Sequence, residues 1–309
     1  MSVEGAERET AESPAERVST EVDGVDVLGA LSPSRAADFT RCALLYRFRT
    51  IDRLPEPPST DAIRGTLVHQ VLEDIFDLPA SERTPERAVA MVEPAWRDLL
   101  EQYPEAATMF ATPDTPDAAD WLLSCHDVVR TWFELEDPRR LEPAERELYV
   151  EALLDSKLLL RGFVDRLDEA PDGSLRISDY KTGRAPAPGF EASALFQLRF
   201  YALALWRTRG VVPRMLQLVY LGSGEVVTYE PDADDLRATE RKIEAIWRAI
   251  REAEQSGDWQ PRRSALCAWC AHQALCPAWG GTPPPLPERP VADQVAVQPA
   301  AVPVASSSG

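Results

Sequence analysis

The spacing of apolar residues along the chain predicts helices on both sides of a central run of strands. In residues 60–76, Ile63, Leu67, Val71 and Ile75 recur at intervals of three or four, which places them on one helical face. The same period recurs in several other stretches, and Gly210 and Gly257 are suited to end two of them. The predicted helices cover residues 32–49, 60–76, 84–103, 118–136, 192–209 and 232–256.

Between these helices the pattern changes to short alternating or apolar runs. Residues 145–154, 157–170 and 175–182 form three such runs, separated by the turn signals Asp-Ser and Ala-Pro-Asp-Gly-Ser. We expect three consecutive antiparallel strands, and two more strands within residues 213–231. The order helix, three strands, helix, two strands, helix predicts an α/β fold with a mixed sheet flanked by helices.

The domain boundaries follow from composition. Residues 1–26 are acidic and poor in aromatics, and residues 282–309 are rich in Pro and Ala, so both are expected to be disordered. Residues 27–281 then form one domain, in which residues 70–147 are a helical insertion with an acidic outer face.

Net charge at first disfavours a nucleic-acid partner, because the whole chain carries −18. The excess, however, lies in residues 1–26 (−6), 70–147 (−12) and 282–309 (−1), which leaves the rest at +1. A local basic path for a phosphate backbone is therefore compatible with the sequence.

Several protein classes are disfavoured by the sequence. No apolar run reaches the ~20 residues of a membrane helix, and the N-terminal residues lack the apolar segment of a secretory signal. The five cysteines are an odd number, which argues against a disulfide scaffold. There is no phosphate-binding G-x-x-x-x-G-K-[ST] motif, so we expect no ATP site. We interpret the protein as cytoplasmic, without a membrane partner.

The stretch Ile177–Gly183, ISDYKTG, holds the first candidate site residues. Asp165 and Asp179 lie on consecutive predicted strands, where a hairpin could bring both carboxylates together. Two such charges repel each other unless a cation lies between them, and oxygen ligands suit Mg²⁺ or Mn²⁺. Lys181 shares a face with Asp179, so its ammonium group could stabilise charge on a phosphate, while the Tyr180 carbonyl could reach the metal.

A helical His–Glu pair precedes these strands. His69 and Glu73 are four residues apart, on one face of the helix predicted for residues 60–76. An imidazole with a nearby carboxylate makes a plausible third ligand and its support.

Four blocks in this order, GTLVHQVLE, GFVDRLD, DYKTG and QLRFYALAL, resemble the RecB-type branch of the PD-(D/E)xK nuclease superfamily. That branch includes the RecBCD and AddAB nuclease domains and the CRISPR-associated iron–sulfur exonucleases. The resemblance covers roughly residues 30–280. It implies a restriction-endonuclease-like core and divalent-metal hydrolysis of DNA phosphodiesters, most simply by an exonuclease in DNA repair or recombination.

The resemblance also assigns roles to residues. His69, Asp165, Asp179 and the Tyr180 carbonyl correspond to metal ligands, and Lys181 corresponds to the catalytic lysine. Gln197 and Tyr201 match the family's Q-x-x-x-Y motif, which lies near the DNA and the active site in that family. Glu73 is a supporting residue or occasional ligand. Because such domains often accompany helicases and this chain has no helicase motif, unwinding would require a separate protein.

Cys267, Cys270 and Cys276 form a C-x2-C-x5-C pattern, and Cys42 precedes them by 225 positions. Zinc usually takes two tight pairs, whereas four thiolates can hold a [4Fe–4S] cluster. Some members of the resembled branch carry one N-terminal and three C-terminal cysteines around such a cluster. Zinc or free thiols remain alternatives. Cys125 is expected in the core, and His272 is not expected to be a ligand.

A second interpretation of the whole chain is a non-cleaving iron–sulfur module that binds DNA ends. Such a module would keep Gln197, Tyr201 and the cysteines but has no need for His69, Asp165, Asp179 and Lys181 together. Their joint presence favours the nuclease.

Overall fold

The core of the protein is a six-stranded mixed sheet, seen in a computed structural model that describes residues 21–22, 25–111, 117–187 and 192–287. The strand order is β3-β5-β6-β7-β8, and β4 pairs with the other edge of β5. The strands are β3 (Gly29–Leu31), β4 (Glu145–Leu153), β5 (Leu158–Glu169), β6 (Leu175–Lys181), β7 (Met215–Tyr220) and β8 (Glu225–Tyr229). The predicted α/β class with a mixed sheet is confirmed.

Strand β5 organises this sheet because three strands pair with it. It forms an antiparallel hairpin with β4 along most of its length, while its first residues pair in parallel with β3 and its last residues pair antiparallel with β6. The β6–β7 pair is parallel, and β7 and β8 form a second hairpin. Strand β3 was not predicted, since three residues are too few to show a period.

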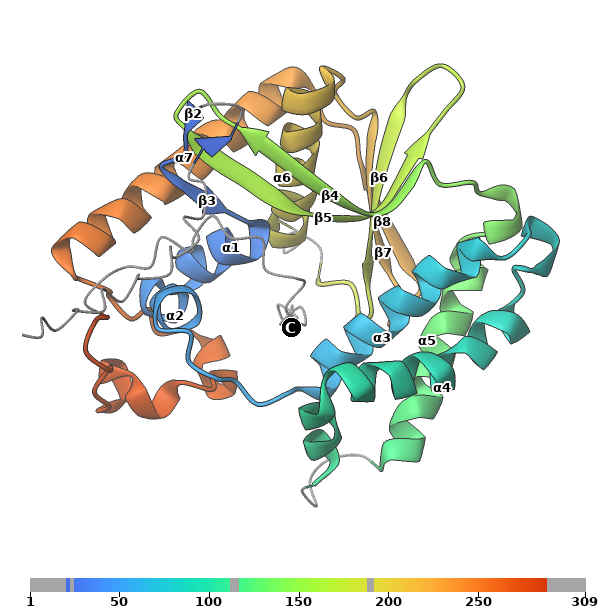
Figure 1. The fold of residues 1–309 in the computed structure, drawn as a ribbon, viewed down its shortest axis with the longest axis horizontal. Coiled ribbons are helices and arrows are strands. Elements are labelled where there is room, and N and C mark those ends of the chain that lie inside the picture. The colour runs from blue at the N-terminus through green and yellow to red at the C-terminus, as the bar shows by residue number, and fades with distance from the viewer. Residues whose placement is uncertain (1–20, 23–24, 112–116, 188–191, 288–309) are drawn as a thin grey trace, which may run out of the picture.

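Helices cover both faces of the sheet (Figure 1). On one face, α6 (Ala192–Arg209) makes the crossover between the parallel strands β6 and β7 and packs on α7 (Ala233–Ser256). Their shared core contains Ile177, Leu216 and Leu218 from the sheet. No helix among the described residues is long and apolar enough to cross a membrane.

The other face carries α3 (Thr60–Asp74), α4 (Pro85–Gln102) and α5 (Ala118–Leu135). Ser59, Thr84 and Asp117 cap the three helices, each accepting a hydrogen bond from a backbone N–H of the first turn. Three tryptophans lie in the core that these helices share with Tyr180, Val219 and Leu221 of the sheet side. The helical part of the predicted insertion is therefore packed against the sheet.

The helix predicted for residues 32–49 is broken at Cys42. Helix α1 (Pro33–Arg41) and the short α2 (Ala43–Tyr46) flank this residue, which has extended backbone angles (φ −164°, ψ 116°). A π-helical turn, Arg47–Ile51, follows. The break turns the Cys42 side chain toward the C-terminal cysteine segment, which lies beside α2 (Figure 1).

The two ends of the chain differ in part from the predicted disorder. Residues Glu21–Val22 (β1) and Val25–Asp26 (β2) form a small antiparallel pair. At the other end, the Pro284 carbonyl accepts a hydrogen bond from Arg47. The remainder of residues 1–26, and residues 288–309, lie outside the described residues.

Candidate metal centre and its lysine

The candidate site lies where β5 and β6 separate. The last paired residues of this ladder are Arg166 and Ser178, so Asp165 and Asp179 face each other one position beyond it. Here the Asp165 carboxylate takes the place of a strand partner, since its Oδ2 accepts a hydrogen bond from the Tyr180 N–H at 2.7 Å. The fork thus brings both predicted carboxylates together.

Helix α3 places His69 over this fork. The His69 Nε2 atom lies 2.9 Å from the Tyr180 carbonyl oxygen, and Nδ1 lies 3.6 Å from Asp165 Oδ2. Both distances link an early helix to strands about a hundred residues later. The two nitrogens of His69 thus contact two of the predicted residues, Nε2 the Tyr180 carbonyl and Nδ1 the Asp165 carboxylate.

Glu147 of β4 joins this group and was not predicted. Its Oε1 lies 3.9 Å from His69 Nδ1, and on β4 it stands between Arg146 and Leu148, which pair with Arg166 and Val164 on either side of Asp165. In the described part of the chain, His69, Glu147 and Asp165 are the one set of three or more potential ligands whose atoms all lie within 4.8 Å of one another. Glu147 could have been found from the Asp-Ser turn, because this turn sets the register of the two strands once both are recognised.

The electrostatics of this group suit a cation. Burial raises the pKa of Glu147 to about 7, and repulsion from Asp165 contributes. Burial also raises the pKa of Asp179 to about 6, with Asp165 adding to the shift and Lys181 opposing it. Carboxylates whose charges are this costly gain most from a positive ion between them.

The donor atoms could hold one divalent cation. His69 Nδ1 faces both carboxylates, at 3.9 Å from Glu147 Oε1 and 3.6 Å from Asp165 Oδ2, and the three ligand atoms all lie within 4.8 Å of one another. The donor set of carboxylates, a carbonyl and one imidazole is typical of Mg²⁺ or Mn²⁺.

Lys181 is held beside the fork by a chain of polar contacts. Its Nζ lies 2.7 Å from Asp179 Oδ2 and donates to Gln197 Oε1 at 3.0 Å. Gln197 Nε2 in turn donates to the Tyr201 hydroxyl at 3.1 Å. Burial works to lower the pKa of Lys181, but Asp179 and Asp165 outweigh it, and the pKa lies above its usual value. The ammonium group therefore stays protonated.

Gly162 makes room for the Tyr201 ring, whose hydroxyl ends this series of polar contacts. A Cβ atom at residue 162 would lie 2.6 Å from Cε1 of the Tyr201 ring, closer than such contacts occur. The tyrosine ring of α6 therefore packs directly on the backbone of β5. The glycine of the predicted GFVDRLD block has this packing role, which sequence spacing alone does not reveal.

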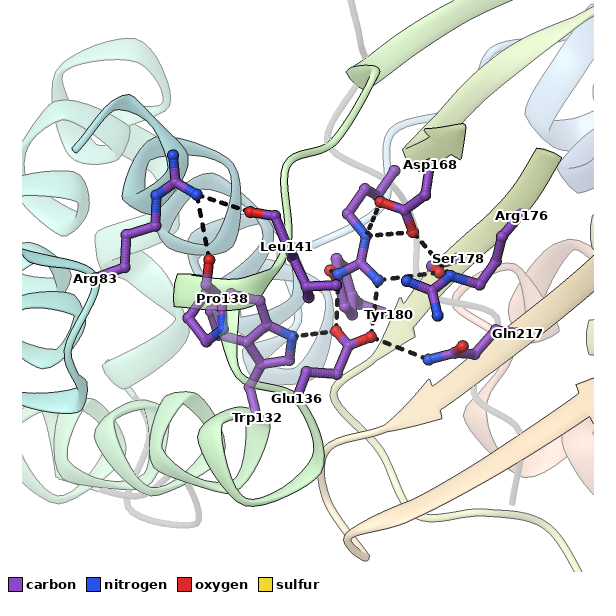
Figure 2. A network of polar contacts seen from close by, with 11 residues as sticks. Arg83, Trp132, Glu136, Pro138, Leu141, Asp168, Arg176, Ser178, Tyr180 and Gln217 are labelled. Carbon is purple, nitrogen blue, oxygen red and sulfur yellow. Dashed lines mark hydrogen bonds and ion pairs between the residues drawn. The ribbon is translucent and has the colours of Figure 1, made fainter. Parts of the chain in front are cut away.

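The reverse face of the fork rests on a buried polar network, shown in Figure 2. The Arg166 guanidinium donates to both carboxylate oxygens of Glu136, at 2.7 and 2.8 Å, and also to the Tyr180 hydroxyl. Trp132 and Gln217 donate to the same Glu136 carboxylate. Glu136, at the end of α5, is thus hydrogen-bonded to Arg166, the residue after Asp165. Arg166 in turn contacts Tyr180, the residue after Asp179.

Glu73, the predicted supporting residue, lines the pocket next to His69 but stays outside the three-residue group. Its backbone carbonyl accepts a hydrogen bond from Arg146 at 2.6 Å. Burial raises the pKa of its carboxyl, and the neighbouring Asp74 contributes. Position 73 is therefore near the centre without ligating distance to all its members.

The four predicted cluster cysteines line one pocket, although Cys42 is remote in sequence. Backbone N–H groups donate to two of the sulfurs, from Arg262 to Cys42 at 3.3 Å and from Ser264 to Cys267 at 3.4 Å. The pKa of Cys270 is raised by burial and by the nearby Cys267 and Cys42. In the described residues no three of these sulfurs lie within 4.8 Å of one another, whereas tetrahedral zinc would set them about 3.8 Å apart.

Two other predicted positions are also visible. Cys125 is fully buried in the core of α3, α4 and α5, which confirms its assignment to the core. His272 is buried beside the cysteine pocket, with its Nε2 2.7 Å from Glu56 Oε1. That nitrogen is engaged by a carboxylate, and Arg49 holds the same Glu56 from the other side.

Comparison with known proteins identifies the family. The family model of the PD-(D/E)XK nuclease superfamily matches residues 30–277, which contain strands β4 to β8 and the fork. The chain belongs to the PD-(D/E)XK nuclease superfamily. The match spans both the metal centre and the cysteine pocket.

Two phage proteins and one solved structure resemble this nuclease chain. The Gene 69 protein of Mycobacterium phage D29 is 29% identical over 275 residues, covering 80% of this chain and 96% of the phage protein. The Gene 69 protein of Mycobacterium phage L5 is 28% identical over 123 residues, or 39% of this chain and 40% of its own. The crystal structure of a candidate exonuclease from Eubacterium rectale shares the fold, with a TM-score of 0.51 at 14% identity over 79% of this chain and 88% of its own.

Proposed function

We propose that this protein is a divalent-metal-dependent deoxyribonuclease of the RecB type, an exonuclease that hydrolyses phosphodiester bonds at DNA ends or in single strands. The observation that carries the proposal is the position of Lys181. Its ammonium nitrogen lies 2.7 Å from Asp179, beside the His69, Glu147 and Asp165 group. A structural metal site has no need for a cation held at its edge.

His69, Asp165, Asp179 and the Tyr180 carbonyl would hold Mg²⁺ or Mn²⁺, and Glu147 adds a further carboxylate to the predicted set. When bound, the ion supplies charge neutralisation at the scissile phosphate and acidifies the attacking water. The protein's own part is to fix these donors. Tyr180 N–H orients Asp165, and the β5–β6 fork sets its distance from Asp179.

Lys181 is assigned the role of stabilising charge that develops on the phosphate. Gln197 and Asp179 restrict its Nζ to one position, which leaves the ammonium group oriented before substrate arrives. Gln197 and Tyr201 act through it as positioning residues. Ionised Asp179 is needed for this arrangement, and with a pKa of about 6 its carboxylate is mostly ionised above pH 7.

The cysteine pocket is proposed to hold a [4Fe–4S] cluster. The support for it is that the four thiols share one pocket and follow the pattern of one N-terminal and three C-terminal cysteines. A cluster there would link Cys42, at the start of the fold, to Cys267, Cys270 and Cys276, and so contribute to folding stability.

DNA repair or recombination is the cellular role proposed from the family, with a separate helicase to provide single strands. The proposed location is the cytoplasm. An ATP site is not part of the proposal, because no phosphate-binding loop motif occurs in the sequence.

The activity is tested with anaerobically purified protein, Mn²⁺ and end-labelled substrates. Single-stranded DNA, duplex DNA, a closed circle and RNA of the same sequence are compared. Progressive release of short products from the labelled DNA, with the closed circle intact, supports an exonuclease. Binding to DNA ends without any cleavage would instead support the non-cleaving module.

A further inference from the structure

Beside the metal centre, the β4–β5 hairpin exposes a pair of aromatic rings. Tyr149 and Phe163 are direct cross-strand partners, with ring centroids 5.3 Å apart and planes at 53°. Their exposed fractions are 36% and 38%, whereas most large aromatic side chains in the described residues are buried. An exposed aromatic pair at this place in the sheet suggests a role in binding.

The rings belong to a row of cross-strand pairs that leads to the metal centre. On this face Leu153 pairs with Leu159 under Val27 and Ala30, Glu151 pairs with Arg161, and Tyr149 pairs with Phe163. The next positions are Glu147 and Asp165. Two residues of a strand span about 7 Å, so the aromatic pair directly adjoins the candidate ligands.

The sheet's core does not account for these rings. The alternate positions, which include Val150, Ala152, Leu160 and Val164, face the core beneath α6 and are buried. An aromatic cross-strand pair adds a fraction of a kilocalorie to a hairpin, but that contribution does not require its position beside Glu147 and Asp165.

Positive charge lies near this row. Arg161 is the next residue on the same face of β5 as Phe163. Burial lowers the pKa of Arg35, and repulsion from Arg161 and Arg53 lowers it further. The Tyr149 hydroxyl donates to Glu151, which holds the ring, and 36% of the residue stays exposed. Cations beside exposed rings are the usual composition of a single-strand path.

We propose that Tyr149 and Phe163 form a stacking platform for unpaired bases of single-stranded DNA entering the metal centre. The inference rests on the proposed nuclease function and specifies its substrate. Bases in a duplex are already stacked on each other, whereas unpaired bases have free faces to place on the rings. A base held here belongs to a nucleotide at or beside the scissile phosphate.

The test is binding of a fluorescent oligothymidylate single strand, measured by anisotropy in EDTA so that no cleavage occurs. The double variant Tyr149→Ala/Phe163→Ala should bind about tenfold or more weakly, because each stacked base contributes measurably to affinity. Tyr149→Phe keeps the ring and should bind like the unchanged protein. Leu123→Ala, an exposed apolar residue on α5, is the matched control and should also bind normally.

A second oligonucleotide of equal length and charge, with abasic spacers in place of bases, separates stacking from electrostatics. The unchanged protein should bind it about as weakly as the alanine variant binds oligothymidylate, and the variant should no longer distinguish the two strands. The comparison of the two strands with the unchanged protein needs no variant, so a folding defect cannot affect its result.

Equal binding of both strands by the unchanged protein would overturn the platform. So would loss of a dimer in the alanine variant with unaltered binding of DNA, since the rings would then form an interface between copies of this chain. If the proposed nuclease function is wrong, the result is different. The unchanged protein would then cleave no nucleic acid with Mn²⁺, whatever the rings bind.

Discussion

Glu147 and Asp165 share one imidazole, because His69 Nδ1 lies 3.9 Å from the Glu147 carboxylate and 3.6 Å from the Asp165 carboxylate. The backbone of Glu147 has a φ of 42°, in the left-handed region, which costs about 1 kcal/mol or more for a residue with a side chain. Strain and charge repulsion thus coincide at one point of the sheet. Both costs are explained if this pair evolved to bind a cation.

Glu147→Gln should therefore stabilise the metal-free protein and weaken its metal binding. The folded-state pKa of Glu147 is raised to about 7, above the unfolded value near 4.5. Stability is then lost as pH rises from about 4.5 to 7, and the loss persists at higher pH. Removing the charge should restore about 1 kcal/mol at pH 8, a discounted value because 35% of the side chain is exposed. Chemical denaturation in EDTA measures it.

The same variant should need about tenfold more Mn²⁺ for half-saturation in calorimetry, because one carboxylate is lost. Glu145→Gln, on the same strand but exposed, is the control and should change neither quantity. If Glu147→Gln lowers the metal-free stability at pH 8 while metal affinity is kept, Glu147 is not part of the centre.

Gly162→Ala should displace Tyr201 and through it Lys181. The added Cβ would lie 2.6 Å from the tyrosine ring, and overpacking of this kind costs about 1–3 kcal/mol. Urea denaturation measures the loss. Combining it with Tyr201→Ala removes the atom that clashes, so the double variant should lose less stability than the two single changes together. Simple addition of the two losses would contradict the packing described for Gly162.

Arg166→Met should be among the most destabilising changes in the sheet. The side chain is 1% exposed and holds Glu136, whose carboxylate would be left buried without its main partner. Breaking such a pair from one side costs about 3–5 kcal/mol. Arg166→Met/Glu136→Met removes both charges and should recover part of the loss. A thermal shift no larger than that of an exposed pair such as Arg130 and Asp127 would contradict this assignment.

Cys267→Ala should remove iron and lower the melting temperature together. Anaerobically purified protein is expected to be brown, with absorbance near ~400 nm that the variant lacks. Cys125→Ala, which changes a core cysteine outside the pocket, should keep its iron. Zinc in place of iron in the purified protein, or an unchanged melting temperature for Cys267→Ala, would refute the cluster.

Much of this arrangement was predictable from the sequence. The strand pattern fixed the β5–β6 hairpin, and with it the nearness of Asp165 and Asp179, while the i, i+4 spacing placed Gln197 with Tyr201. Position 69 was predicted from the order of four sequence blocks. The hairpin depends on local periodicity, which a single sequence displays, whereas the roles of His69, Gln197 and Tyr201 came from the resemblance to a known family.

Glu147 was missed because its signal is not local. In the segment ERELYVEALL, charges alternate with apolar residues as on any solvated strand face, so Glu147 has no distinguishing neighbour. Its role depends on register with β5 and on its unusual φ. The break at Cys42 and the Arg166–Glu136 pair likewise depend on contacts between segments distant in sequence.

The central claim is that a divalent ion and Lys181 act together on DNA. It is tested most directly by the Mn²⁺-dependent cleavage rate of an end-labelled single strand. The rate is compared between the unchanged protein, Lys181→Ala and the control Lys242→Ala, which changes an exposed lysine of α7. The prediction is a rate lowered at least a hundredfold in Lys181→Ala, with Mn²⁺ binding retained, and a normal rate in Lys242→Ala. A Lys181→Ala protein that cleaves DNA at the normal rate would contradict the account.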